Sequence, residues 1–547
     1  MQADARPAET TVLIVGGGPS GLTLALDLGL HGVECHVINA EAGHTQNPRC
    51  NTTSARSMEH FRRLGVASRV RAAGLPADYP TTVQYRTSMT GYELFRMEFP
   101  SSRDVISGAG KEGWATPEPQ HRISQLYLEP VLEDAARSTP GVTVERGCRL
   151  VSLRQYEGYV EATVENAGGV REIRARYLAG CDGAHSTVRQ AIGVRYSGVS
   201  AIRKFVSTFL RSAEIGEIAA RDPAWTYWAY GEHFASLLAI DGHDLWLNHI
   251  AFPADHDTDD EDPAALLRET IGRQVEHEVI GTVRWTGRQL VADRYRDGRV
   301  FLVGDAAHIW IPIGGFGMNA GIQDAAGLAW LIVAVEQGWA APAILDAYEL
   351  ERRPVGEQFA AEVAATAHRS LSVEITPALA EEGAAGDAAR ARMREILSQT
   401  ERGRYDPEGF SFGYHYAGSP LVAGGTAATI AMVGYPATAQ PGYRLPHVWM
   451  PDGRPIFDLL GDAYTLLRVA RADLDVTRLT AAAAARGVPL KVLDVGTAQA
   501  DPYPGALILV RPDQHIAWMG NELPPTGALL DRITGHQLAH DLAKSGA

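Results

Sequence analysis

The residues with the clearest chemistry follow the apolar run 300–303, which has the pattern of a short buried strand. Asp305, just past that strand, can accept hydrogen bonds from sugar-type hydroxyls. Gly315 and Gly317 let a flat ligand approach the backbone, and a helix expected from about Met318 favours negative charge at its N-terminus. Together these features suit a reduced, anionic flavin, although an ordinary strand–loop–helix crossover is the plainer alternative.

A second glycine-rich segment near the N-terminus has the GxGxxG pattern, formed by Gly16, Gly18 and Gly21. An apolar strand, 11–15, precedes it, and an amphipathic helix, 22–30, follows it. In this context the first glycine permits a tight turn, the second admits a pyrophosphate, and the third packs the helix on the strand. The segment therefore predicts dinucleotide binding.

The ribose-binding acid expected after the second strand, 33–38, is absent. Asn39 stands in its place, and Glu41 follows two residues later. Asparagine can still bond a ribose hydroxyl but lacks the charge. This motif alone therefore does not settle which dinucleotide binds.

Composition narrows the class of partner and the compartment. The 547-residue chain can form two or three domains, and its net charge of −15 argues against nucleic acid. No apolar stretch is expected to reach the roughly 18–20 residues of a membrane span, and residues 1–10 lack signal-peptide features. The cysteines show no CxxC and no metal-ligand spacing, so we expect a reduced, cytoplasmic protein without a metal site; they are Cys35, Cys50, Cys148 and Cys181.

Three ordered motifs together carry a family resemblance. They are the GxGxxG segment, the pair Asp182-Gly183, and the pair Gly304-Asp305 before a glycine-rich loop. The chain resembles the single-component flavoprotein aromatic hydroxylases, the 4-hydroxybenzoate hydroxylase-like group. The resemblance covers essentially the whole chain and implies FAD as cofactor. The residues it implies for FAD binding are Gly16, Gly18, Gly21, Asn39, Glu41, Arg49, Arg122, Gln125, Asp182, Asp305, Gly315, Gly317, Met318 and Asn319.

Within that group, Asn39 and the run 125–130 look most like the chlorophenol and 2-hydroxybiphenyl hydroxylases. Those proteins carry a C-terminal thioredoxin-like module, and residues 441–520 look similar. No CxxC follows residue 400, so dithiol chemistry is excluded there and a structural or homo-oligomerisation role is the better interpretation.

The expected fold is α/β: a Rossmann-like FAD-binding domain, an inserted α+β substrate domain, and a C-terminal thioredoxin-like domain. The strand and helix patterns place a discontinuous cofactor domain around the inserted one. The predicted ranges are 1–75, 120–190 and 290–360 for the FAD-binding domain, 76–119 and 191–289 for the substrate domain, 361–400 for a helical linker, and 401–547 for the C-terminal domain.

The resemblance also implies a reaction. NADPH or NADH reduces FAD transiently, and the reduced flavin reacts with O2 to give a C4a-hydroperoxide that hydroxylates a phenol-like or hydroxypyridine-like ring, ortho to a hydroxyl. The protein must exclude water from this site and orient the cofactor. A nearby base or hydrogen-bond acceptor should lower the effective pKa of the phenol.

Active-site residues are where the chain departs from its relatives. Phenol-hydroxylating relatives often place an acid or histidine at the position of Asn51, which can bond a phenol but cannot take its proton. Arg122 stands where the most similar branch tends to have an acid. His249 and Tyr227 are candidate replacements for the base, each with a structural role as the alternative, and Pro312 is expected to fix the loop facing the flavin.

Three other functions remain open. A flavin-dependent dithiol reductase would need a second GxGxxG and a CxxC, and neither is visible. A flavin-dependent halogenase, epoxidase or oxygenase acting on a polyketide-type product is poorly separated by sequence. A noncatalytic binding protein that uses a flavin fold is the alternative from another class.

Overall fold

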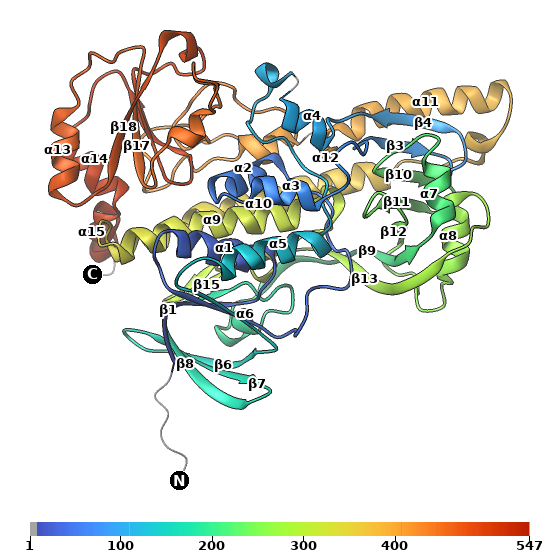
Figure 1. Ribbon diagram of the computed structural model, residues 1–547, viewed down its shortest axis with the longest axis horizontal. Coiled ribbons are helices and arrows are strands. Elements are labelled where there is room, and N and C mark those ends of the chain that lie inside the picture. Colours follow the sequence, from blue (N-terminus) through green and yellow to red (C-terminus); the bar gives the residue numbers. More distant parts are fainter. Residues whose placement is uncertain (1–7, 109, 406, 546–547) are drawn as a thin grey trace.

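The structure is a computed structural model and describes residues 8–545 apart from 109 and 406. Figure 1 shows three parts: a sheet that contains β1 and β8, a second sheet that contains β9 to β12, and a C-terminal part around β17 and β18. The long helices α9 (Phe316–Glu336) and α10 (Ala347–Leu371) run through the middle of the molecule.

The first sheet has the strand order β14-β15-β8-β1-β2-β5, with β7 and β6 joined to one end of β8. Its centre is parallel, since β1 pairs in parallel with both β2 and β8. Helix α1 begins at Pro19 directly after β1, and proline suits the first position of a helix. The strands are β1 Ala8–Val15, β2 Cys35–Asn39, β5 Val142–Arg146, β6 Arg149–Gln155, β7 Val160–Asn166, β8 Gly169–Gly180, β14 Arg296–Asp297 and β15 Val300–Leu302.

Helices cover this sheet and bury its apolar strands. Helix α1 packs against α9 and α5, and α2 packs against α9. The helices of this part are α1 Pro19–Leu30, α2 Ala55–Arg63, α3 Ala67–Ala73, α5 Gln125–Arg137 and α6 Thr187–Ala191, together with α9 and α10.

The second sheet is mostly antiparallel, with the order β16-β13-β9-β12-β11-β10-β3-β4. Two of its strands, β13 and β16, lead back to the first sheet. Its strands are β3 Val83–Arg86, β4 Glu93–Met97, β9 Tyr196–Arg211, β10 Thr226–Tyr230, β11 Phe234–Ala239, β12 Leu245–Phe252, β13 Glu278–Ala292 and β16 His308–Ile309. The associated helices are α4 Ser102–Ser107, α7 Ala213–Ala219, α8 Pro263–Ile271, α11 Ala384–Thr400 and α12 Arg402–Tyr405.

The C-terminal module (residues 441–545) contains a four-stranded sheet in the order β18-β17-β19-β20. The parallel pair β17 and β18 is joined by α13, and the antiparallel pair β19 and β20 forms a hairpin. The thioredoxin-like character of this module and its role in homo-oligomers stay predictions. The elements are β17 Tyr464–Val469, α13 Thr477–Ala485, β18 Leu490–Val495, β19 Leu507–Val510, β20 Ile516–Gly520, α14 Thr526–Ile533 and α15 His536–Ser545.

The predicted α/β class is confirmed by this arrangement. All strands of the first sheet fall within 1–75, 120–190 and 290–360, whereas β13 crosses the predicted limit at residue 290. The division into domains at those limits stays a prediction.

One expectation about apolar stretches needs correction. Helix α9 is long and apolar enough, with a mean hydropathy of 1.3, to cross a membrane by length and composition. However, 89% of that apolar stretch is buried inside the protein, against α1 and α2. Its apolar residues are therefore accounted for by the core of the molecule.

Candidate active site

The GxGxxG loop has the geometry that each glycine was expected to supply. Gly16 has a φ of +114°, and a Cβ there would lie 2.2 Å from the carbonyl oxygen of Cys181. A Cβ on Gly21 would lie 2.0 Å from the carbonyl oxygen of Gly16, so the helix packs tightly on the strand. A Cβ on Gly18, at the N-terminus of α1, would meet nothing within 4 Å. The loop thus leaves open space at a helix N-terminus, as an anionic diphosphate requires.

Asn39 and Glu41 lie at the end of β2, beside this loop. The side-chain oxygen of Asn39 accepts a hydrogen bond from the Gly17 N–H at 3.0 Å, and its amide donates to the Glu41 carbonyl at 3.1 Å. Glu41 is exposed. Asn39 therefore fixes the glycine loop, and ribose binding by either residue stays a prediction.

The second motif is held by its own aspartate. Asp182 accepts hydrogen bonds from the Ser186 hydroxyl at 2.5 Å and from the Val188 N–H at 3.1 Å. Burial raises the pKa of Asp182, and these hydrogen bonds oppose the rise. Since Cys181 contacts Gly16, the first two motifs lie against each other.

The third motif meets the first at the start of α1. Gly304 has a φ of +61°, and a Cβ there would come within 2.9 Å of the Ser20 hydroxyl. Asp305 follows with an exposed side chain, yet protein surrounds it closely enough that burial raises its pKa, while the charges of His308 and Arg49 oppose the rise. Asp305 thus presents an accessible carboxylate where the three motifs converge.

The glycine-rich loop is fastened to the segment 50–54. Asn319, in the first turn of α9, donates to the carbonyl oxygens of Thr52 (2.9 Å) and Gly315 (2.7 Å) and accepts from the Ser54 N–H (2.7 Å). Asn319 is therefore a loop anchor as well as a predicted cofactor residue. Of the remaining loop residues, Pro312 is exposed, and Gly317 and Met318 are half-buried.

A buried ion-pair network holds the start of this loop, and it was not predicted from the sequence. Asp324 accepts hydrogen bonds from the His308 ring at 2.8 Å, from the Arg352 guanidinium at 2.7 Å and from the Gly304 N–H at 3.1 Å. All these groups are buried. The network joins α9 and α10 to the start of the loop, so His308 is a structural residue there.

These residues fit FAD. The open space at Gly18 lies at a helix N-terminus, and Asp305 offers an accessible acceptor for ribityl hydroxyls. Arg49 is exposed nearby and supplies positive charge. Gln125 lies at the start of α5, where its N–H donates to the Cys50 carbonyl and its side chain to Glu129.

On the second sheet, a polar trio lies on one face. His249 is hydrogen-bonded through Nδ1 to the Ser207 hydroxyl at 2.6 Å, and the Trp285 indole N–H donates to the same hydroxyl at 2.7 Å. Burial lowers the pKa of His249 to about 4, so its ring is neutral near pH 7. Ser207 and Trp285 were not predicted, because no sequence spacing marks residues that meet across three strands.

Packed aromatic and aliphatic side chains connect this trio to the glycine-rich loop. Trp285 stacks on Phe205 with ring centroids 4.1 Å apart, and a Cβ on Gly287 would lie about 3 Å from both Phe205 and Ile311. Ile311 directly precedes the loop. His249 therefore belongs to the sheet face that meets the predicted flavin loop.

A cavity of about 380 Å³ lies between this sheet and α10. Its volume falls within the range of small-molecule sites. Arg203 lines this cavity. It lies an even number of positions from Phe205 and Ser207 along β9, so the three side chains share a face. The lining residues are Ile202, Arg203, Pro253, Ala254, Gln289, Ala364, His368 and Ser372.

Tyr227 lies on the opposite face of this sheet. It pairs with Leu237, whereas His249 pairs with Ser236, and successive residues of a strand alternate between faces. Its hydroxyl donates to the Asp222 carbonyl and accepts from the Ala224 N–H, both at 2.9 Å. The structure therefore does not bring the two candidate bases together, and a catalytic role of Tyr227 stays a prediction.

Asn51 and Arg122 lie near the loop that carries Thr52. Asn51 is buried, and its side-chain oxygen has no hydrogen-bond partner among the described residues. Arg122 is also buried and donates to the Thr52 hydroxyl at 3.0 Å. Both residues therefore have unused hydrogen-bonding capacity beside the loop.

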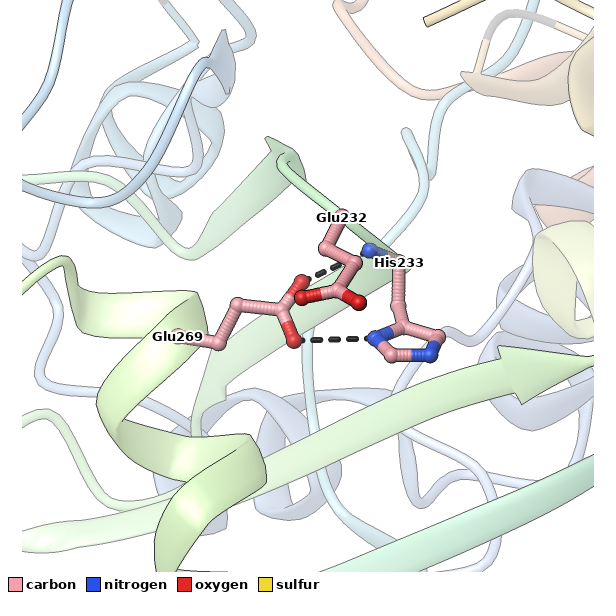
Figure 2. Close-up of side chains that lie close together, drawn as sticks. All are labelled: Glu232, His233 and Glu269. Atoms are coloured by element: carbon pink, nitrogen blue, oxygen red, sulfur yellow. Dashed lines mark hydrogen bonds and ion pairs between the residues drawn. The ribbon is translucent and has the colours of Figure 1, made fainter.

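One cluster outside this region has the composition of a metal site. Figure 2 shows Glu232 and His233, in the turn between β10 and β11, beside Glu269 of α8. Glu269 accepts from the His233 N–H at 2.6 Å and lies 2.9 Å from its ring Nδ1. Both carboxylate oxygens of Glu269 are thus used to hold the turn, and we interpret the cluster as a structural clamp.

Buried neutral histidines make a pH prediction for stability. Burial lowers the pKa of His121 to about 3, whereas an unfolded histidine titrates near 6.5. Below pH 6.5 the unfolded chain therefore binds a proton that the folded chain does not, and the free energy of unfolding falls by about 1.4 kcal/mol per pH unit for this group. Above pH 6.5 this histidine does not make the free energy of unfolding depend on pH.

The measurement is the urea unfolding midpoint of the wild type and His121→Asn at pH 8, 7, 6 and 5. The difference between the two proteins isolates this histidine from carboxyl groups such as Asp182, whose raised pKa acts with the opposite sign. We expect a constant difference between pH 8 and 7 and a relative loss of stability by the wild type below 6.5. Parallel profiles down to pH 5 would contradict a neutral His121.

Two protein-family models match this chain, one over its first two thirds and one near its C-terminus. A family model described as "FAD binding domain" matches residues 9–363, which include all three motifs. A second, described as "Aromatic-ring hydroxylase, C-terminal", matches residues 438–537. The second match coincides with most of the C-terminal module.

Similar curated proteins and solved structures span nearly the whole chain. The tetracenomycin B2 monooxygenase-dioxygenase of Streptomyces olivaceus is 33% identical over 571 residues, covering 97% of this chain and 99% of the relative. Aklavinone 12-hydroxylase RdmE of Streptomyces purpurascens is 30% identical and covers 94% and 96%. A structure of RebC with bound 7-carboxy-K252c has a TM-score of 0.89 at 35% identity and covers 97% and 99%.

Proposed function

Since the chain belongs to the family of FAD-dependent aromatic-ring hydroxylases, we propose that it hydroxylates a phenol-type aromatic ring, ortho to a hydroxyl group. The enzyme is a flavoprotein monooxygenase with FAD as cofactor, as the motifs predicted. When bound, FAD supplies the redox chemistry that carries electrons from NAD(P)H to O2. The residues of this chain bind it, exclude water and position the ring to be oxidised.

The hydrogen-bonded trio of Trp285, Ser207 and His249 carries the proposal. An indole N–H can only donate, so it takes a lone pair of Ser207 and leaves the serine proton for Nδ1 of the neutral histidine. The remaining ring proton is then on Nε2. The Trp285 N–H bond to Ser207 polarises the serine hydroxyl and so strengthens its hydrogen bond to His249.

An Nε2–H donor on the face that meets the flavin loop suits a phenol. Hydrogen bonding to a phenolate oxygen favours the ionised form and so lowers the pKa of the bound phenol. A phenolate ring is more electron-rich at its ortho carbon than a phenol. His249 therefore acts as the donor that stabilises the phenolate, and Asn51 offers an acceptor for a second polar group.

A polycyclic, polyketide-type phenol is the substrate class that the relatives favour. Relatives of this chain are described as a putative polyketide hydroxylase and as the tetracenomycin B2 and tetracenomycin A2 monooxygenase-dioxygenases. The cavity of about 380 Å³ beside β9 and α10 has the volume of a small-molecule site. Epoxidation of such a product remains the second candidate reaction.

His249→Phe tests the donor directly. It keeps a buried ring on the strand but removes Nε2–H, and we expect kcat/KM for 2-naphthol to fall about 100-fold, as when one oxyanion donor is lost. The pH profile of kcat/KM should shift to higher pH, because the bound phenol ionises less readily. Trp285→Phe keeps the stacking on Phe205 and should give a smaller loss with a shift in the same direction.

Wild-type and variant profiles from pH 6 to 10 distinguish this role from a structural one. A structural defect lowers the rate equally at every pH. An unshifted profile for His249→Phe would refute the proposed donor.

A further inference from the structure

Arg122 lies in a box of three aromatic rings. Its guanidinium carbon is 4.2 Å from the ring centroid of Trp225, 5.6 Å from that of Phe99 and 5.8 Å from that of Tyr405. A guanidinium stacked on rings binds anions at its edge, because its N–H groups lie in its plane. One edge nitrogen donates to Thr52, and the other, Nη2, is buried without a partner among the described residues.

The charge of this guanidinium is not balanced within the described part of the chain. Arg122 is 2% exposed, and no carboxylate there forms an ion pair with it. Other arginines that are no more than 6% exposed do contact a carboxylate; they are Arg56, Arg71, Arg352, Arg404, Arg444 and Arg511. A buried cation without an anion is unfavourable, and burial accordingly lowers the pKa of Arg122 to about 10.

The position of Arg122 connects the flavin loop with the substrate sheet. Thr52, which holds one guanidinium nitrogen, is itself bound by Asn319 of the loop. Trp225, on the other side, directly precedes β10. Arg122 therefore lies between the segment that Asn319 holds and the residue that precedes β10.

The space beside Arg122 restricts the kind of anion. A small cavity of about 20 Å³ borders it, lined also by Phe99, Ser102 and His121. This is close to the space that one water occupies, so a carboxylate oxygen suits it and a diphosphate does not. The open space at Gly18, by contrast, lies at the helix N-terminus that suits a diphosphate.

We propose that Arg122 is the receptor for a carboxylate group, carried by the aromatic substrate. This inference rests on the proposed function, because it assigns an acid group to that substrate. A carboxylate pairs with the coplanar N–H groups of a guanidinium edge, and the three rings exclude water from the pair. The box thus selects aromatic acids over neutral analogues.

The test compares binding of 3-hydroxy-2-naphthoate with that of its carboxamide to the oxidised, FAD-loaded protein without NAD(P)H. Flavin absorbance and calorimetry both report the dissociation constant. We expect the acid to bind at least about tenfold more tightly than the amide, since hydrogen bonds to charged groups exceed neutral ones by that factor. The preference should fall to within about twofold in Arg122→Met and Arg122→Gln.

Arg103→Met is the matched control. Arg103 is an exposed arginine of α4, next to the cavity residue Ser102. Its substitution removes the same charge without changing the aromatic box. It should keep the tenfold preference. Arg122→Met should unfold at a urea concentration no lower than the wild type does, because an apolar side chain replaces an unpaired buried charge.

A second arm uses free sodium acetate to distinguish the source of the carboxylate. If acetate binds to the wild type with the same dependence on Arg122, the site takes small free carboxylates as well; if only the aromatic acid binds, the carboxylate is that of the substrate. Both outcomes support a carboxylate receptor.

The proposal is overturned by equal affinities for acid and amide, by no binding of acid, amide or acetate, or by a preference that survives in both Arg122 variants. Loss of FAD affinity in Arg122→Met with an unchanged preference for the acid would instead assign Arg122 to the cofactor. Because binding is measured without turnover, these results are independent of whether the protein forms a hydroxylated product, which tests the proposed function.

Discussion

Gly18→Val is expected to leave the ligand-free protein folded and to weaken its FAD binding about 100-fold. Gly18 has a φ of −85° and an extended ψ, so a side chain causes no backbone strain, and its Cβ would meet no protein atom within 4 Å. That open space lies at the N-terminus of α1, where the diphosphate of a dinucleotide is favoured. The valine fills the space that the cofactor needs, and such a clash costs about 1–3 kcal/mol.

Gly21→Ala is the matched control with the opposite expectation. A Cβ at Gly21 would lie 2.0 Å from the carbonyl oxygen of Gly16, so the helix must move away from the strand. The apoprotein itself should lose about 1–3 kcal/mol of unfolding free energy. Calorimetric titration of each apoprotein with FAD, together with urea unfolding, separates the effects. Normal FAD affinity in Gly18→Val would contradict the assignment of this loop.

Glu59→Gln is expected to lower the unfolding free energy by about 3–5 kcal/mol, the cost of breaking a buried ion pair. Glu59 of α2 is 2% exposed and accepts hydrogen bonds from Arg56 (2.8 Å), from the Nε of Arg444 (2.9 Å) and from Thr116 (2.7 Å). Burial raises the pKa of Glu59, but the two arginines outweigh it, so the carboxyl is ionised. The amide leaves two buried guanidinium groups without their anion.

The same substitution tests how the C-terminal module is attached. Arg444 belongs to that module, and Arg56 also donates to the Gln514 side chain at 2.5 Å and the Asp513 carbonyl at 2.6 Å. Urea unfolding of Glu59→Gln should therefore show early separation of the module. The control is Glu165→Gln, which removes an exposed pair with Arg149 and should cost less than about 1 kcal/mol. Equal stabilities of the two variants would argue against this attachment.

The cofactor half of the molecule could be predicted because its chemistry depends on short segments. Gly16, Gly18 and Gly21 lie within six residues of chain, and each has a separate steric reason. The parallel strand, the glycine turn and the helix start are local consequences of sequence. Asp305 could be placed in the same way, because it lies three residues past the end of β15.

The substrate half could not be predicted to the same depth, because it depends on which strands become neighbours. His249 and Tyr227 have equal standing in the sequence, but strand register puts them on opposite faces. Only their hydrogen bonds in the folded protein, which link them to His249, identify Ser207 and Trp285 as candidate site residues. Arg122 could be singled out, but its aromatic box combines Phe99, Trp225 and Tyr405, which are distant in sequence.

The supporting network was missed for a related reason. Asp324 and Arg352 are both on helices, 28 positions apart, and each alone is typical of a solvent-exposed charge. Their burial follows from the packing of α9 against α10. Sequence patterns predict the elements, whereas ion pairs between elements require the packing.

The most direct test of the central claim is to follow the oxygen atom. The FAD-loaded protein, with NADPH or NADH under ¹⁸O2, is given a panel of hydroxylated aromatics of one to four rings, and products are analysed by mass spectrometry. We expect substrate-stimulated oxidation of the reduced nicotinamide and a product that carries one ¹⁸O atom on the carbon ortho to a hydroxyl. Nicotinamide oxidation that gives only hydrogen peroxide across the whole panel, with no labelled product, would contradict it.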